Sequence, residues 1–263
     1  MNPIKVVIHG ATGRVGQVLI KTLYRESAVK LVGAVDIKTP GEKLVLDDGS
    51  VIPFSSDLGQ ILDTTHPEVM VDFSLASATM PAARSAIQNK VHLVIGTTGL
   101  TADNLVEIDR LAKTAGIGAI VASNFALGAV LMMHFAKMAS KYMDFAEIIE
   151  LHHDQKLDAP SGTALSTAKA MAAYRGKPFS RAVDEGKNFA SRGEKVNGVT
   201  IHSVRLPGLM AHQEVILGGL GQTLTIRHDT INRECYVPGV LLAVQGVVQR
   251  QGLILGLEKL LEL

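Results

Sequence analysis

Short apolar runs alternate with amphipathic segments through the first half of the chain. The runs at 4–9 and 29–35 flank a segment of helical periodicity at 16–25. The alternation continues with expected strands at 69–73, 91–95 and 117–122 and expected helices at 78–89 and 101–115. Apolar strands separated by helices are typical of a doubly wound parallel sheet. We therefore expect an α/β domain in which the strand at 117–122 closes the series.

The pattern changes after residue 123. Expected helices at 127–142 and 163–175 flank a strand at 145–153, and a polar, glycine-bearing stretch at 179–197 reads as a long loop. Three further strands are expected at 199–205, 213–217 and 222–227, the last two joined by a hairpin through Gly218-Gly-Leu-Gly221. Strands joined by short turns predict a mixed open sheet in an α+β domain at 124–232. The apolar helix expected at 238–249 should pack back on the first domain, which then comprises residues 1–123 and 233–263.

A glycine-rich turn follows the first expected strand and opens the first helix. The pattern is Gly-x-x-Gly-x-x-Gly, and Asp36 ends the second expected strand, where an acid can bind an adenosine ribose. The alternative is a strand–helix turn without a ligand, but the acid at this spacing favours a Rossmann-type dinucleotide site. The expected contacts in the turn are Gly10, Ala11, Thr12, Gly13, Arg14 and Val15.

The choice between NADH and NADPH stays open. Asp36 favours free ribose hydroxyls, whereas a nearby base can bind the 2′-phosphate of NADPH. Lys38 and Arg14 are candidates for that base, and either could equally be a plain surface charge.

Polar segments follow three other expected strands. They are Asp72-Phe-Ser74, Gly96-Thr97-Thr98-Gly99 and Ser123-Asn124-Phe125. Ligands bind beyond the carboxyl ends of strands in such sheets, so the last two segments are candidates for the cofactor site. Gly96 to Gly99 could also be a simple turn that caps the next helix, and the common position of the three segments at one edge is better evidence than any one of them.

The stretch from Glu150 to Ala164 concentrates the candidate catalytic chemistry. His152 and His153 can exchange protons near neutral pH, and Lys156 adds a positive charge. A helix start near Gly162 and Thr163 would offer free backbone N–H groups to an anion. Each of these residues alone could be a core or surface residue. Together they indicate a pocket for a small carboxylate that receives a proton.

Composition limits the other classes of function. The net charge is +1 and there is no Trp, which gives no reason to expect nucleic acid or an anionic membrane as partner. Cys235 is the single cysteine, which fits a reducing cytoplasm. No apolar run has the length of a membrane span, and the first residues lack the features of a signal peptide. We expect a cytoplasmic protein without a metal site.

These motifs together resemble the 4-hydroxy-tetrahydrodipicolinate reductase family, also called dihydrodipicolinate reductases. The resemblance covers nearly the whole chain and rests most on His-His, Lys and Asp-Ala-Pro-Ser-Gly-Thr-Ala between Glu150 and Ala164. It implies NAD(P)H-dependent reduction of 4-hydroxy-tetrahydrodipicolinate to tetrahydrodipicolinate in lysine and diaminopimelate biosynthesis. It also implies a homotetramer built by the second domain.

The resemblance assigns roles to the candidate residues. His152 is the expected proton donor and Lys156 the second catalytic group, with His153, Gly162 and Thr163 binding a substrate carboxylate. The cofactor would be lined by the glycine-rich turn, Asp36 and Lys38, and by Gly96, Thr97, Thr98, Ser123, Asn124 and Phe125. The segment from Arg205 to His212 departs from the family pattern, so His212 receives no role.

Two alternatives remain at this stage. An aspartate or homoserine dehydrogenase would share the first-domain signals but would not explain Glu150 to Ala164. A non-catalytic NAD-sensing protein would keep the glycine-rich turn but would need neither His152 nor Lys156.

Overall fold

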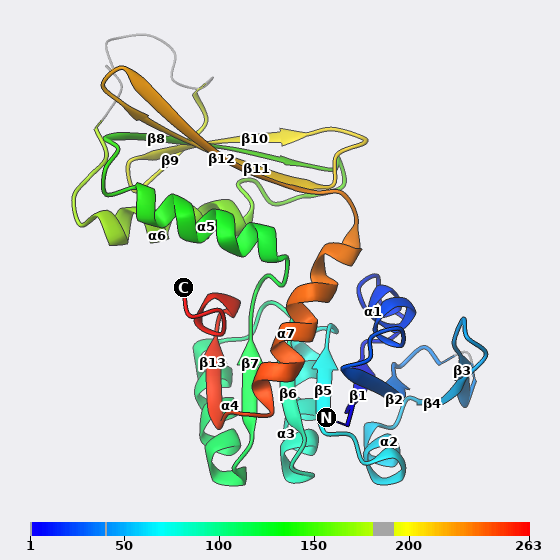
Figure 1. Cartoon of the computed structure of the whole chain (residues 1–263). Helices are drawn as coiled ribbons and strands as arrows, with labels where there is room; N and C mark the ends of the chain where they lie inside the picture. Colours follow the sequence, from blue (N-terminus) through cyan, green and yellow to red (C-terminus); the bar gives the residue numbers. More distant parts are fainter. Residues whose placement is uncertain (1, 40, 181–191) are drawn as a thin grey trace. The chain divides into compact units, whose positions relative to one another are not determined.

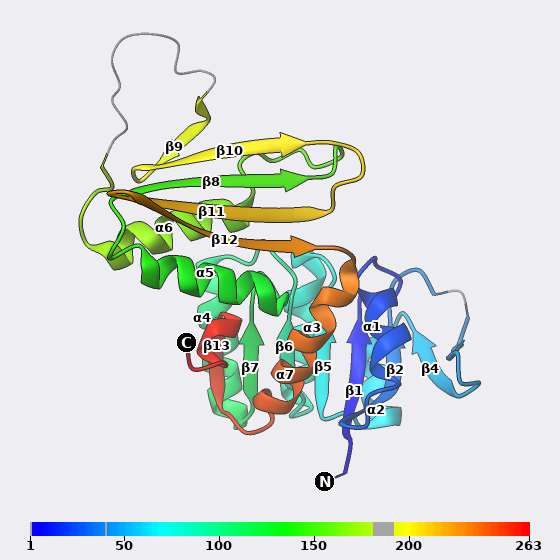
Figure 2. The same cartoon turned by 45° about the horizontal axis from the view of Figure 1, so that its top comes forward.

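The computed structural model describes residues 2–39, 41–180 and 192–263. The chain divides into two compact units, drawn in Figures 1 and 2: unit 1 is Met1–Ala126 with Arg233–Leu263, and unit 2 is Leu127–Asn232. In the described part of the chain, no helix is long and apolar enough to cross a membrane.

Unit 1 contains a sheet that, among the described residues, has eight strands in the order β13-β7-β6-β5-β1-β2-β4-β3. Neighbouring strands are parallel except for the antiparallel pair β3 and β4. The bounds are β1 Ile4–His9, β2 Val29–Val35, β3 Lys43–Val45, β4 Val51–Ser55, β5 Val69–Asp72, β6 His92–Ile95, β7 Gly118–Val121 and β13 Gly252–Leu255.

Helices cover both faces of this sheet, as expected for a doubly wound fold. The helices α1 (Gly16–Leu23) and α7 (Val237–Val247) contact each other, and α7 contacts β5, β6 and β7. The helices α2 (Leu58–Thr65), α3 (Ala76–Gln88) and α4 (Ala102–Ala115) pack side by side on the other face.

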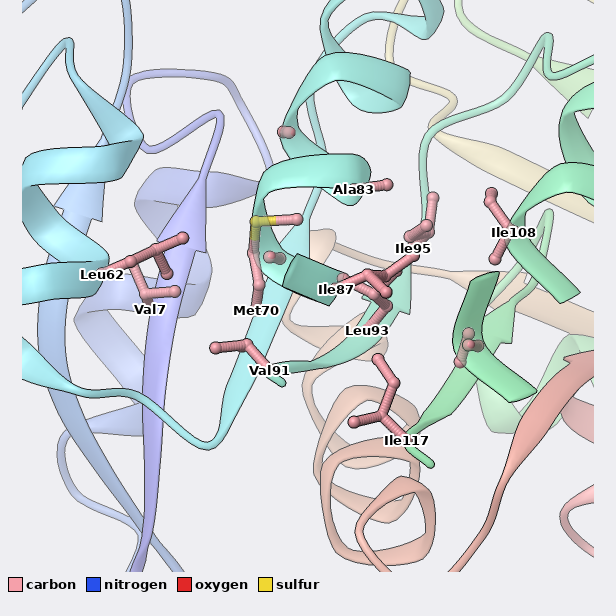
Figure 3. Close-up of a cluster of buried hydrophobic side chains, with 14 of the residues drawn as sticks. Val7, Leu62, Met70, Ala83, Ile87, Val91, Leu93, Ile95, Ile108 and Ile117 are labelled. Carbon is pink, nitrogen blue, oxygen red and sulfur yellow. The ribbon is translucent and has the colours of Figure 1, made fainter. Parts of the chain in front are cut away.

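The core under α2, α3 and α4 is apolar and closely packed (Figure 3). Met70, Leu93 and Ile95 from the strands are fully buried against Ala83 and Ile108 from the helices. Fully burying such side chains contributes about 1.5–3 kcal/mol each, so this layer holds the strand ends in place.

The predicted helices and parallel strands of unit 1 are confirmed, with end shifts of a few residues, but one further parallel strand was not predicted. The strand β13 comes from the end of the chain and pairs with β7 in parallel. Its sequence, Gly-Leu-Ile-Leu, is too short to show a period. The strands β3 and β4 and the helix α2 were also not predicted, because Pro53 and the turn around Gly49 obscure the alternation.

Unit 2 contains a mixed sheet, in agreement with the predicted α+β class. In the described part of the unit the order is β12-β11-β8-β10-β9, with β8 parallel to β10 and antiparallel to β11. The bounds are α5 Leu127–Ala139, β8 Phe145–His152, α6 Gly162–Arg175, β9 Glu194–Val196, β10 Val199–Arg205, β11 Ala211–Gly219 and β12 Gln222–Thr230.

The helices α5 and α6 pack on one face of this sheet. Their side chains Met132, Ala168 and Met171 share a core with Ile148 of β8 and Val215 of β11. The expectation of a loop at 179–197 is partly wrong, because the strand β9 lies within this stretch and pairs with β10. Residues 181–191 of that stretch lie outside the described part of the chain.

Candidate functional site

The glycine-rich turn of unit 1 folds closely against the end of β5. Gly10 has a φ of +82°, and a Cβ placed there would lie 2.5 Å from the carbonyl oxygen of Phe73. A Cβ on Gly16 would lie 2.1 Å from the carbonyl oxygen of Gly10, whereas one on Gly13 would lie 3.1 Å from it. Gly10 and Gly16 are therefore required by the turn itself. The N–H groups of Thr12 and Gly13 already donate to Asp36 and to the carbonyl of Gly10, so the N–H groups of Arg14 and Val15, just before α1, are the ones that can meet a phosphate.

An ionised acid lies beside this turn. The carboxylate of Asp36 accepts hydrogen bonds from the backbone N–H of Thr12 (2.9 Å) and of Lys38 (3.1 Å). Burial raises the pKa of Asp36, but these hydrogen bonds outweigh it and hold the pKa below its usual value. The side chains of Lys38 and Arg14 are exposed. An acid at the end of β2 and a glycine cradle before α1 fit the ribose and pyrophosphate of a dinucleotide.

The expected cofactor residues beyond β6 and β7 divide into exposed and internal ones. Thr98 and Ser123 are exposed. Thr97 is buried, and its hydroxyl donates to Asp72 (3.0 Å) while accepting from the backbone N–H of Ser74 (2.9 Å). Its side chain is thus committed to the protein, and its backbone is the part that a cofactor could reach.

Aromatic packing fixes the remaining members of this group. Phe125 is buried and meets Phe73 edge to face, with ring centroids 5.4 Å apart. A Cβ on Gly96 would lie 2.2 Å from the ring of Phe73, so Gly96 is needed to admit that ring. The side-chain oxygen of Asn124 accepts the N–H of Ala126 (2.9 Å). Phe125 therefore belongs to the core of unit 1.

A pocket of about 260 Å³ adjoins the glycine-rich turn. Thr12 lines it together with Ile20 of α1, with Tyr24 just after α1, and with Leu46 and Phe54 from the β3–β4 region. It provides a mostly apolar hollow inside unit 1 that sequence reasoning did not anticipate.

In unit 2, His152 is held by a buried carboxylate on its own strand. Residues two apart on a strand share a face, which brings Glu150 next to His152. The Nδ1 atom of His152 lies 2.5 Å from a carboxylate oxygen of Glu150, which has no solvent exposure. Burial raises the pKa of Glu150, but hydrogen bonds from His152 and Arg205 outweigh this effect and lower the pKa to about 2.

Arg205 ties Glu150 to the segment that follows His152. Its guanidinium donates to both carboxylate oxygens of Glu150, at 2.9 and 2.8 Å. It also donates to the backbone carbonyls of Lys156 (3.3 Å) and Asp158 (2.6 Å). One side chain therefore fixes the acid and the shape of the loop at the same time.

Lys156 is on this loop and is only partly exposed. Its ammonium group lies 2.7 Å from both carboxylate oxygens of Asp158. Its backbone N–H donates to the carbonyl of His153 (3.2 Å), so the loop turns back between the two residues. His153 is partly buried.

The loop ends at the start of α6, as predicted. Ser161 caps the helix by accepting the N–H of Ala164 (3.2 Å), and the N–H of Ser161 donates to Glu150 (3.2 Å). The first-turn N–H groups of Gly162 and Thr163 have no acceptor within the helix. Nothing lies within 4 Å of a Cβ built on Gly162, so this helix end has open space in front of it.

In unit 2, His152 ends β8, His153 and Lys156 lie on the loop that follows, and Gly162 and Thr163 begin α6, so the predicted residues follow one another along one short segment. Sequence reasoning assigned no role to Glu150 or Arg205. The period-2 relation of Glu150 to His152 was available in the sequence. Arg205 comes from β10, and only the parallel pairing with β8, which sets Arg205 opposite His152, reveals it.

His212 now has a structural explanation. Its Nδ1 lies 2.7 Å from a carboxylate oxygen of Asp229, and its Nε2 accepts the N–H of Met210 (3.2 Å). One ring nitrogen thus pairs across the β11–β12 hairpin and the other accepts from the residue just before β11, so the ring helps to hold this part of unit 2.

A doubly wound sheet with a glycine cradle and an ionised acid, joined in one chain to a mixed-sheet unit with an oriented histidine, defines a two-domain oxidoreductase of the Rossmann type. The family models for the N-terminus and the C-terminus of dihydrodipicolinate reductase match residues 4–125 and 128–261. The chain belongs to the dihydrodipicolinate reductase family.

Individual relatives agree over their whole length. A 4-hydroxy-tetrahydrodipicolinate reductase of Dehalococcoides mccartyi is 56% identical, covering 100% of both chains, and one of Moorella thermoacetica is 48% identical, covering 98% of both. A dipicolinate-bound dihydrodipicolinate reductase from Paenisporosarcina has a TM-score of 0.88 at 39% identity, covering 98% of this chain and 99% of that one. The predicted family and enzyme class are confirmed, which removes both alternatives.

Proposed function

We infer that this chain reduces 4-hydroxy-tetrahydrodipicolinate to tetrahydrodipicolinate, a step of lysine and diaminopimelate biosynthesis, with NADH or NADPH. Full-length relatives at 56% and 48% identity carry the name of that activity. The structural relative at 39% identity is bound to dipicolinate, a planar dicarboxylate. The observation that carries the proposal is the oriented imidazole of His152, which Glu150 holds at the end of β8, followed within the stretch 152–163 by the ammonium group of Lys156 and the N-terminus of α6.

The substrate's carboxylates would be recognised by the start of α6. The N–H groups of Gly162 and Thr163 and the positive end of the helix dipole favour an anion, and the space in front of Gly162 can admit one. We propose that His153 adds a further contact from the loop. Lys156 would exchange its pairing with Asp158 for a substrate group, because a carboxylate in the site competes for the same ammonium.

His152 is the proposed proton donor. Glu150 occupies its Nδ1, so Nε2 is the ring nitrogen through which a proton can pass to the substrate. The substrate loses its 4-hydroxyl group as water, which leaves a conjugated cyclic imine, and a bound reduced nicotinamide would supply the hydride that reduces this ring. Lys156 would stabilise the negative charge that develops before protonation.

One unit would bind the cofactor and the other would bind the substrate. Residues 1–123 and 233–263 would bind the dinucleotide through the turn from Gly10 to Val15, Asp36, and the backbone beyond β6 and β7. We assign substrate binding and tetramer formation to residues 124–232. The cytoplasmic location expected from the sequence stays a prediction.

The homotetramer is proposed from the second face of the unit 2 sheet. The helices α5 and α6 pack on the face that carries Ile148 and Val215. The neighbouring residues Ile149, Leu151 and Ile216 point to the opposite face and are partly exposed. An apolar sheet face of this kind is usually covered by another subunit.

A reductase assay with enzymatically generated substrate tests the proposed function. We expect oxidation of NADH or NADPH that depends on both the substrate and the protein. A folded sample that binds a reduced nicotinamide cofactor but does not oxidise it with this substrate would contradict the proposal.

A further inference from the structure

Glu150 is a buried carboxylate next to His152, the proposed proton donor. It is fully buried, and three different groups donate hydrogen bonds to its carboxylate: the Nδ1 of His152, the guanidinium of Arg205 and the N–H of Ser161. A buried carboxylate is costly unless it is paired and hydrogen-bonded, and this one is satisfied on every side. The cost and the number of partners indicate a function beyond filling the core.

The ionised state of Glu150 decides which nitrogen of His152 carries the proton. A carboxylate only accepts hydrogen bonds. If Nδ1 carried no proton, its lone pair would lie 2.5 Å from a carboxylate oxygen and repel the lone pairs of that oxygen. The arrangement therefore requires a proton on Nδ1. In the neutral ring Nε2 is then an unprotonated acceptor, and in the charged ring it is the donor.

We propose that Glu150 is the positioning residue for His152, and that Arg205 fixes Glu150 in turn. This inference rests on the proposed function, because it gives His152 the role of proton donor. Glu150 sets the tautomer and the ring orientation of His152, so that every proton exchanged with the substrate passes through Nε2. Arg205 keeps the carboxylate ionised and in place, and binds the carbonyls of Lys156 and Asp158, which couples the orientation of His152 to the position of Lys156.

Glu147, on the same strand β8 as Glu150, offers a matched control. It also pairs with a histidine, since Nε2 of His202 lies 2.8 Å from its carboxylate. Because Glu147 is three residues from Glu150, it lies on the opposite face of the strand, and it is partly exposed. A Glu147→Gln variant makes the same chemical change on the sheet face that carries Ile149 and Leu151, and light scattering checks that its mass equals that of the wild type.

Nitrogen-15 NMR of the His152 ring tests the geometry without any activity measurement. In the unliganded wild-type protein we expect Nδ1 to stay protonated as the ring becomes neutral, with Nε2 losing the proton. A wild-type ring in which Nε2 carries the proton and Nδ1 is bare would overturn the proposal.

Steady-state kinetics test the consequence. The loss of a carboxylate that orients a catalytic imidazole can lower kcat by up to about 10⁴-fold, so we expect Glu150→Gln to lower kcat by at least about tenfold. The KM for substrate should change much less, and Glu150→Asp should recover part of kcat because it keeps a carboxylate. Glu147→Gln should stay near the wild-type kcat. A Glu150→Gln enzyme with wild-type kcat would refute the positioning role.

A double variant separates positioning from folding. Glu150→Gln leaves Arg205 without its counter-charge and is expected to lower the melting temperature. Combining it with Arg205→Gln removes both charges, so the melting temperature should recover in part while kcat stays low. If kcat returned together with stability, Glu150 would act through folding alone. An inactive wild-type protein with the expected NMR signals would count against the proposed function and not against the geometry.

Discussion

Buried carboxylates organise both units at the scale of single residues. Asp72 in unit 1 accepts hydrogen bonds from Thr79 (2.5 Å) and Thr97 (3.0 Å) and lies 2.7 Å from Nδ1 of His9. Burial raises the pKa of Asp72, but hydrogen bonds led by His9 lower it below its usual value. Glu150 repeats this arrangement in unit 2. In each case a charge that is costly to bury is used to fix a loop at the end of a strand.

The low pKa of Glu150 predicts how stability depends on pH. A carboxyl group whose pKa is lower in the folded than in the unfolded state stabilises the fold when ionised, and this contribution disappears as protons bind. We expect the stability that the wild type has over Glu150→Gln to be complete above pH 4.5 and to fade as the pH falls toward about 2. Urea unfolding over this range measures it, and a difference that did not change with pH would contradict it.

Cofactor choice is also decided at the residue scale. If Lys38 meets the 2′-phosphate of NADPH, Lys38→Ala should raise the KM for NADPH by roughly 3–10-fold, the effect of an exposed charge pair of about 1 kcal/mol. The KM for NADH should hardly change. Lys43→Ala, at an exposed lysine on β3, is the control. Equal effects of Lys38→Ala on both cofactors would make Lys38 a surface charge only.

At the scale of elements, the sequence predicted the helices and strands that have a clear period. The expected strands at 29–35 and 199–205 match β2 and β10 residue for residue. The elements that it missed are short or interrupted, such as β13 and the β3–β4 pair. Their formation depends on neighbouring strands that supply hydrogen bonds, which a local pattern does not contain.

The candidate site likewise contains residues that the local sequence reveals and residues that only the fold brings together. His152, His153 and Lys156 could be found because they lie within one short stretch of sequence. Arg205 could not, because it is 55 residues from Glu150 and meets it only through the pairing of β8 with β10. Side-chain direction was equally hidden, as Phe125 and Thr97 demonstrate by pointing into unit 1.

The N-terminus of α6 provides a prediction at this scale. Gly162→Val should raise the KM for substrate by about tenfold or more, since loss of one charge-assisted hydrogen bond costs roughly 1.5–3 kcal/mol. The melting temperature should change little, because no atom lies within 4 Å of a Cβ added at this position. Steady-state kinetics and thermal unfolding measure the two quantities. A variant with unchanged KM would remove this helix end from the substrate site.

At the scale of the whole molecule, the uncovered sheet face of unit 2 predicts assembly. Light scattering should give a mass near four times 28.0 kDa. Ile216→Glu, on that face, should lower the mass by placing a charge in the interface. Val106→Glu, at an exposed position on α4, should leave it unchanged. A wild-type mass of one chain at working concentration would contradict the tetramer.

The central claim is that His152 passes a proton to the substrate of a reductase whose cofactor is held by the other unit. The most direct test compares kcat, KM and the affinity for NADH of the wild type and of His152→Gln. We predict a loss in kcat of roughly 10²–10⁴-fold, the usual effect of removing a general acid, with a smaller change in KM. The affinity for NADH should be unchanged, because the variant lies in unit 2. A His152→Gln enzyme that folds, binds NADH and turns over near the wild-type rate would contradict the account.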